Sequence, residues 1–198
     1  MPSIAEYLVA IRAALTPLKL RWYVFGAQAV IAAGAVRQTA DLDITTDDVP
    51  VAQLLKALKS AGFRLRDDID GLEDLIEHHR ILPLVHAKTG YQLDVVRAGP
   101  GPEQEMLARS IRRRVGRVQI PFVETNDLLV LKILAGREKD LEDVRSLLRS
   151  ASKEIDVKVV RARLSELGAL IDDSSLVALF EQQLRTVEAK SPRRRVPH

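Results

Sequence analysis

The chain has 198 residues, 46% of them apolar and 29% charged, with a formal net charge of +3. Such a composition is typical of a soluble globular protein with one substantial core and room for a helical addition. Cysteine is absent, which excludes disulfides and thiolate metal sites. No apolar run approaches the ~18 residues of a membrane span, and the first residues lack the pattern of a secretory signal, so we expect a cytoplasmic protein with no membrane partner.

The first half of the chain predicts helices and strands in alternation. Up to residue 66 we expect a helix over 3–16 ended by Pro17, a strand over 21–25, a helix over 27–33, a strand over 41–45, a helix over 51–61 and a strand over 63–66. The acidic stretch 67–77 reads as a loop. Residues 81–86 and 92–96 then predict paired strands joined by the turn Lys88-Thr89-Gly90.

The second half is predominantly helical. Gly99-Pro100-Gly101-Pro102 breaks the pattern before a helix over 103–110, and the β-prone residues around Gly116-Arg117 predict a hairpin. Helices follow at 126–135, 139–150, near 157–168 and 173–189. We therefore expect an α+β core over 1–124, a helical region over 125–190, and a disordered basic tail over 191–198 that contains Arg193, Arg194 and Arg195.

Two carboxylates stand out in the first half. Asp41 and Asp43 are one residue apart on a predicted strand, so both point to the same face. Like charges so close are unfavourable unless a cation lies between them, and Mg²⁺ prefers hard oxygen ligands of this kind. The alternative is a solvated strand end or turn, which is the better interpretation for the neighbouring Asp47 and Asp48.

The residues before this pair suggest a phosphate site. Gly26 and Gly34 bracket a small-residue helix that follows the first predicted strand. A glycine at a strand-to-helix junction lets backbone N–H groups approach a phosphate, and the helix start adds partial positive charge.

The segment Phe25-Gly26-Ala27, followed after thirteen residues by Asp41-Leu42-Asp43-Ile44, resembles the signature of the DNA polymerase β-like nucleotidyltransferases. With Gly34, Arg37 and Thr39 leading into the acidic pair, it most resembles the AbiEii/AbiGii-type nucleotidyltransferases, which include toxins of toxin–antitoxin systems. The resemblance covers about residues 20–148 and implies a mixed sheet flanked by helices. Ala27 departs from the family's usual Ser or Gly, so it offers a phosphate only its main-chain N–H.

The resemblance implies a third carboxylate from a neighbouring strand, and Asp94 in the β-prone run 91–96 is the candidate. Asp41, Asp43 and Asp94 would then be both the catalytic residues and the ligands of a pair of Mg²⁺ ions, with Asp94 available as the base for an attacking hydroxyl. Gly26, Ala27, Arg37 and Thr39 would bind the nucleoside triphosphate. The alternative for Asp94 is a strand-end aspartate that faces water.

Lys132 interrupts the apolar run of the helix predicted over 126–135. A lysine in such a setting must reach water or an anion. The spacing from Asp127 to Lys132 resembles an AbiEii-type motif in which the lysine faces nucleotide phosphates, and a surface lysine is the alternative. Asp140 and Asp143 share one helix face. For them we favour an ion-pair network with Arg137 or Lys139 over the family's functional motif.

The remaining charged and titratable residues are less specific. Arg112 and Arg114 alternate with Arg113 on the predicted hairpin, so the hairpin either contacts an RNA backbone or is an edge strand protected by charge. His78, His79 and His86 are too few and too scattered to bind zinc without cysteine.

The resemblance implies a Mg²⁺-dependent enzyme that transfers a nucleoside monophosphate from a triphosphate such as ATP to an acceptor hydroxyl. An RNA 3′ end, including tRNA, would be the acceptor in the toxin branch, and a cognate antitoxin would be the partner. The alternatives are transfer to a small hydroxylated molecule such as an aminoglycoside, or a catalytically inactive nucleotide-binding module on the same scaffold.

Overall fold

The structure is a computed structural model that describes residues 3–190. These residues form two compact units: residues 3–32 with 37–124 form unit 1, and residues 33–36 with 125–190 form unit 2. The tail predicted over 191–198 lies outside the described residues.

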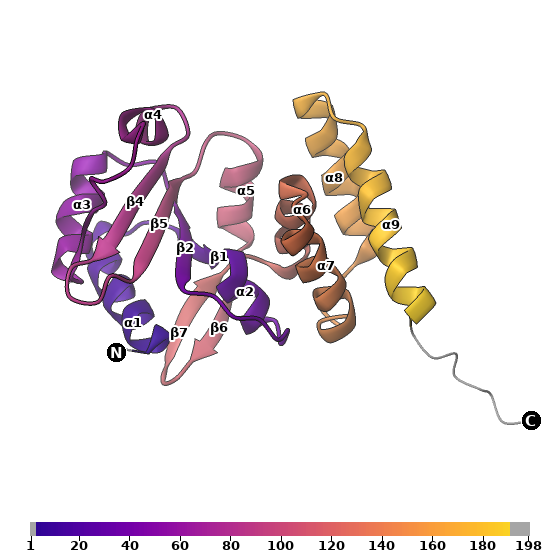
Figure 1. Cartoon of the computed structure of the whole chain (residues 1–198), viewed down its shortest axis with the longest axis horizontal. Helices are drawn as coiled ribbons and strands as arrows, with labels where there is room; N and C mark the ends of the chain where they lie inside the picture. The colour runs from indigo at the N-terminus through magenta and orange to yellow at the C-terminus, as the bar shows by residue number, and fades with distance from the viewer. Residues whose placement is uncertain (1–2, 191–198) are drawn as a thin grey trace, which may run out of the picture. The chain divides into compact units, whose positions relative to one another are not determined.

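Unit 1 is built on a mixed seven-stranded sheet (Figure 1). Its strand order is β3-β4-β5-β2-β1-β7-β6, and the bounds in chain order are β1 Trp22–Phe25, β2 Asp41–Thr46, β3 Phe63–Leu65, β4 Ile81–His86, β5 Gln92–Arg97, β6 Ile111–Val115 and β7 Val118–Phe122. The pairs β2–β5 and β1–β7 are parallel, and the other neighbours are antiparallel. The predicted mixed sheet with a helical C-terminal part is confirmed.

The helices of unit 1 are α1 Ile4–Leu15, the short 3₁₀ helix η1 Thr16–Leu18, α2 Gly26–Ala32, α3 Val51–Ser60, α4 Leu72–Glu77 and α5 Pro102–Arg109. Ser3 and Glu6 form a capping box that fixes the start of α1. The prediction of a loop over 67–77 was wrong for its second half, which is α4. Gly71, at φ 71°, allows the chain to turn there, and Glu73 and Asp74 favour a helix start by lying in its first turn.

Strand alternation separates an apolar face from a polar one. Leu42 and Ile44 on β2 and Leu93 and Val95 on β5 are fully buried, because the two parallel strands pair in register with these side chains on one face. Burial of each such side chain contributes roughly 1.5–3 kcal/mol. The residues that alternate with them, which include the predicted acids, must therefore point to the opposite face.

The hairpin predicted around Gly116 is confirmed. β6 and β7 pair up to Val115 and Val118, and Gly116 has a positive φ of 59° in the two-residue turn between them. β6 is an edge strand of the sheet. Arg112 and Arg114 are exposed whereas Arg113 is half-buried, as their alternation predicts.

Unit 2 is helical over α6 Thr125–Ala135, α7 Glu138–Ser150, α8 Val157–Ile171 and α9 Ser175–Lys190. Its core includes Leu129, Ile133, Val160 and Phe180, each fully buried. The Asp156 side chain accepts hydrogen bonds from the first turn of α8. Over the part of the chain that the structure describes, no helix is both long and apolar enough to span a membrane.

Candidate active site

Asp43 and Asp94 lie opposite each other on neighbouring parallel strands. They are register partners in the β2–β5 pair, and Asp41, two residues earlier, pairs with Gln92. Neighbouring strands are ~4.8 Å apart, and both aspartates project from the same face of the sheet. The structure therefore brings the predicted carboxylates from two separate strands to one place in unit 1.

Asp94 occupies an unusual environment for a carboxylate. Its Oδ1 is buried and has no hydrogen-bond partner in the described structure, although the Arg66 guanidinium Nη2 lies 3.7 Å away. Arg66 is held by a hydrogen bond of 2.6 Å to Gln92 Oε1. Burial raises the pKa of Asp94 above its ordinary value, with Arg66 opposing the shift and Asp41 adding to it. The protein thus holds this carboxyl in a state that favours uptake of a proton or a cation.

Gly26 packs its backbone directly against Asp43. β1 ends at Phe25, the register partner of Asp43, so the next residue reaches the acid. Gly26 has a φ of 62°, and a Cβ added there would overlap the Asp43 carboxylate and come to 3.0 Å from its Cγ. Only glycine combines this backbone conformation with such a close approach.

We expect Gly26→Ala to displace the Asp43 carboxylate and to destabilise unit 1 by roughly 1–2 kcal/mol, because alanine is strained at positive φ. Urea unfolding of this variant measures the loss. Gly34→Ala is a matched control, since Gly34 also has a positive φ, 92°, but nothing lies within 4 Å of its added Cβ. Equal nucleotide affinity and equal activity of the two variants would contradict a special role for Gly26.

The other residues predicted to bind nucleotide in unit 1 are near the start of β2 or at α2. Thr39 Oγ1 accepts a hydrogen bond of 3.2 Å from the Asp41 backbone N–H, so this hydroxyl orders the entry into the strand. Arg37 is half-buried, and Ala27 is buried in the first turn of α2. Their binding of a nucleotide stays a prediction.

Sequence reasoning missed two residues that the fold brings to this site. Arg66 follows β3, far from the acids in sequence, and no local pattern distinguishes it from other surface arginines. Tyr91 precedes β5, and its ring stacks on Tyr7 with centroids 4.5 Å apart. The pKa of Tyr91 is raised by burial in the first place; a hydrogen bond with Gln28 lowers it, and the charges of Asp41 and Asp43 raise it further.

Lys132 belongs to unit 2, where two buried carboxylates bind it. Its Nζ lies 2.8 Å from Asp140 Oδ1 and 2.8 Å from Asp143 Oδ2. Arg137 Nε lies 2.5 Å from Asp140 Oδ2, so the favoured interpretation of the two acids as an ion-pair network is confirmed. Binding of a phosphate by Lys132 stays a prediction.

The histidines lie apart from the acids. His78 and His79 are exposed and both contact Asp74, at 3.0 and 3.3 Å. His86 packs edge-on against Tyr7 and Phe63. These positions agree with the solvent and core roles expected from the sequence.

The Asp43 and Asp94 carboxylates suit a Mg²⁺ ion that is bound by two protein ligands. They do not form a complete site of three carboxylates with Asp41. Among residues 3–190, no group of three or more histidine, aspartate or glutamate residues is arranged to hold a metal ion. Mg²⁺ is usually bound through one or two carboxylates and completes its shell with water and substrate phosphates. The Asp43–Asp94 pair, with the buried Oδ1 of Asp94 lacking a hydrogen bond, meets that requirement.

The mixed seven-stranded sheet with its helices is a nucleotidyltransferase-like fold. Residues 8–190 match the family described as nucleotidyltransferase of unknown function (DUF6036), and the chain belongs to this family. This is a family of transferase enzymes. None of the curated proteins matches the chain in sequence.

Solved structures of other proteins share the fold. The solution structure of the antibiotic-resistance factor ANT(2″)-Ia matches with a TM-score of 0.59 and 16% identity, over 85% of this chain and 94% of that chain. The crystal structure of ANT(2″)-Ia in complex with adenylyl-2″-tobramycin matches with a TM-score of 0.57 and 16% identity, over 82% of this chain and 97% of that chain.

Proposed function

We propose that this protein is a Mg²⁺-dependent nucleotidyltransferase that moves a nucleoside monophosphate from a triphosphate such as ATP to an acceptor hydroxyl. The observation that carries the proposal is the in-register placement of Asp43 and Asp94 beside the backbone of Gly26. Two carboxylates on one face give the hard oxygen ligands that a magnesium–triphosphate complex requires. Membership of a nucleotidyltransferase family supports the same reaction.

In this proposal Asp43 and Asp94 would hold the metal, and Asp41 lies at the rim of the site. When bound, Mg²⁺ neutralises the triphosphate and stabilises the departing pyrophosphate. Asp94 is the carboxylate that accepts the proton of the attacking hydroxyl. Gly26 lets the start of α2 pack directly against the Asp43 carboxylate, because it has no side chain to occupy that space. Ala27, Arg37 and Thr39 complete the nucleotide site.

Two acceptors are supported by different observations. The exposed arginines of the β6 edge strand favour an RNA 3′ hydroxyl, and with it the toxin role and a cognate antitoxin partner. The fold shared with ANT(2″)-Ia, solved in complex with adenylyl-2″-tobramycin, favours the hydroxyl of a small molecule. The transfer chemistry at the acids is the same in both cases.

The test is a labelling reaction with the full chain, Mg²⁺ and each α-labelled nucleoside triphosphate, offered total RNA or a panel of aminoglycosides. We expect label on one acceptor class, loss of labelling in EDTA, and a loss of about 10²-fold or more in Asp43→Asn. Asp67→Asn is the control, because Asp67 is an exposed carboxylate outside β2 and β5 and pairs with Arg64 at 3.3 Å.

Equal labelling by Asp43→Asn and the wild type would reject the metal ligands. Binding of a nucleotide without transfer to either acceptor class would support the alternative of a catalytically inactive module. If the label appears on RNA, the acceptor is an RNA hydroxyl. If it appears on an aminoglycoside, the acceptor is a small molecule.

A further inference from the structure

A concave basic surface lies in unit 1 at the start of β1, whereas the Asp43–Asp94 pair lies beside the end of this strand. This basic groove has a volume of about 490 Å³, and its lining includes Arg12, Lys19, Arg21, Trp22, Arg112 and Pro121. Trp22 begins β1 and Phe25, beside Asp43, ends it, so about 10 Å of strand separates the groove from the acids. A ligand in the groove therefore leaves the acid pair open.

The charge of the groove is one-sided. Four of its lining residues are cationic and none is acidic. Arg12, Lys19 and Arg112 are exposed, and their side chains form no ion pair within residues 3–190. Three like charges around one hollow repel each other, and an anion that lay among them would relieve this repulsion.

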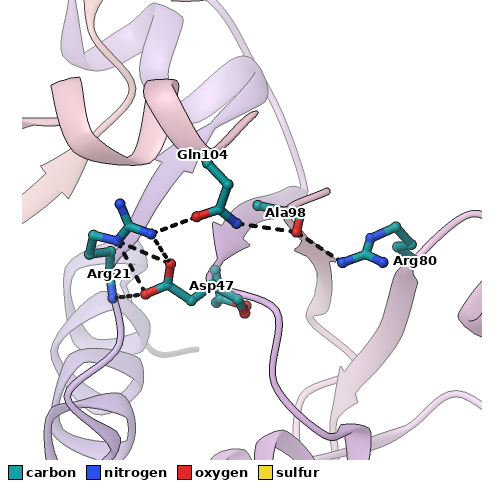
Figure 2. A network of polar contacts seen from close by, with 6 residues as sticks. Arg21, Asp47, Arg80, Ala98 and Gln104 are labelled. Atoms are coloured by element: carbon teal, nitrogen blue, oxygen red, sulfur yellow. Dashed lines mark hydrogen bonds and ion pairs between the residues drawn. The ribbon is translucent and has the colours of Figure 1, made fainter. Parts of the chain in front are cut away.

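The fourth cation is held in place by the fold. The Arg21 guanidinium donates hydrogen bonds to Asp47 Oδ1 at 2.6 Å and to Gln104 Oε1 at 2.5 Å, while Gln104 Nε2 contacts the Ala98 carbonyl (Figure 2). Arg80 donates to the same carbonyl at 2.9 Å. Arg21 is thus fixed in position, and its charge is already compensated by Asp47. The uncompensated charge of the groove comes from Arg12, Lys19 and Arg112.

Local geometry places these cations in the groove. Arg12 is in the last turn of α1, and Lys19 adopts a left-handed backbone with φ 54° at the end of η1, a conformation that glycine would adopt at lower cost. Arg112 is the register partner of Pro121 on the edge hairpin. Arg114 lies two residues further along the same face, about 6.8 Å on, so the basic surface continues past the groove.

We propose that the basic groove binds the phosphodiester backbone of a single-stranded nucleic acid. Cations that extend along an edge strand exceed what a single phosphate needs, and they suit a ligand with regularly spaced charges. Trp22 lines the groove but is only 8% exposed, so it offers no stacking platform, and binding is to the backbone rather than to the bases. The exposed large apolar side chains, such as Leu170 and Val36, lie outside the groove lining, which disfavours a lipid surface.

The test measures binding of fluorescent 12-nucleotide RNAs of two unrelated sequences to the full chain by anisotropy, without triphosphate or Mg²⁺. The groove variant carries Arg12→Gln, Lys19→Gln and Arg112→Gln. The control carries Lys56→Gln, Lys59→Gln and Lys88→Gln, three exposed lysines outside the groove, so both variants have the same net charge.

We expect the groove variant to lose at least about tenfold in affinity for both RNAs and the slope of log K against log salt to fall by about 2, as for three lost phosphate contacts to a single strand. The control should stay within about threefold of the wild type. Equal losses in the two variants would show diffuse electrostatic attraction and overturn the proposal. Displacement of RNA by inorganic phosphate at an equal phosphate concentration would show a small-anion site and also overturn it.

This binding does not depend on nucleotidyl transfer. Asp43→Asn should bind both RNAs as tightly as the wild type, because Asp43 is at the other end of β1. Failure of the labelling reaction therefore leaves the groove proposal standing, and failure of the groove test leaves transfer to a small hydroxylated molecule standing.

Discussion

Asp94→Asn is expected to lower nucleotidyl transfer by about 10²–10⁴-fold while the fold remains at least as stable as that of the wild type. Loss of a positioned base has an effect of this size, and loss of a metal ligand adds to it. The variant should not lose stability, because burial disfavours the charged form of Asp94 in the wild type. Arg66, whose Nη2 lies 3.7 Å away, offsets this cost only in part. The amide of asparagine carries no charge and avoids this cost.

The pH dependence follows from the raised pKa of Asp94. The folded protein binds this proton more tightly than the unfolded chain, so the carboxyl favours folding below its ordinary pKa and loses that contribution as pH rises through the raised value. Asp94→Asn should therefore gain in relative stability as pH rises.

Thermal unfolding in EDTA at pH 4 and pH 8 measures this difference. Asp67→Asn is the control, since Asp67 is largely exposed and pairs only loosely with Arg64 at 3.3 Å. Addition of Mg²⁺ with a triphosphate should raise the Tm of the wild type more than that of Asp94→Asn, because a ligand stabilises the state that binds it. If the Asp94→Asn variant were less stable than the wild type at pH 8 and kept full activity, Asp94 would be neither the base nor a metal ligand.

Lys132→Met is expected to destabilise unit 2 by about 3–5 kcal/mol. The substitution removes the ammonium group that lies 2.8 Å from both the Asp140 and the Asp143 carboxylates, and it leaves Asp140 with Arg137. Burial by itself would raise the pKa of Asp140, yet hydrogen bonds from Arg137 and Lys132 outweigh it and lower that pKa. Asp140 therefore stabilises the fold above its ordinary pKa and loses this contribution as pH falls, so the effect of the substitution is largest near neutral pH.

Urea unfolding at pH 7 measures the loss, with Lys153→Met as the control for removal of an exposed lysine. The double variant Lys132→Met, Asp143→Leu should recover part of the stability, because it also removes a buried carboxylate that Lys132 bound. Its KM for the triphosphate then separates the two roles of Lys132. An unchanged KM indicates a structural lysine, and a KM raised tenfold or more supports the predicted phosphate contact. A loss below 1 kcal/mol in the single variant would contradict the network.

The comparison of prediction and structure is clearest at α4. Residues 67–77 predict a loop because they are acidic and lack an apolar period. The structure has a six-residue helix there, started by Gly71 in a left-handed conformation. A short helix with no fully buried residue leaves little periodic signal, since such a signal arises from burial of one face. The hairpin at Gly116 was predictable, because a two-residue turn is a local requirement.

By itself the sequence determined the alternation along β2 and β5, the turn glycines, the helical second half, and the assignment of Asp41 and Asp43 to one face. These features depend on neighbours within a few residues, where backbone geometry allows few choices. Only the tertiary structure decided that Asp94 is the register partner of Asp43, that Arg66 faces it, and that Arg12, Lys19 and Arg112 line one groove. Contacts between residues distant in the chain depend on strand order and packing, which no local pattern encodes.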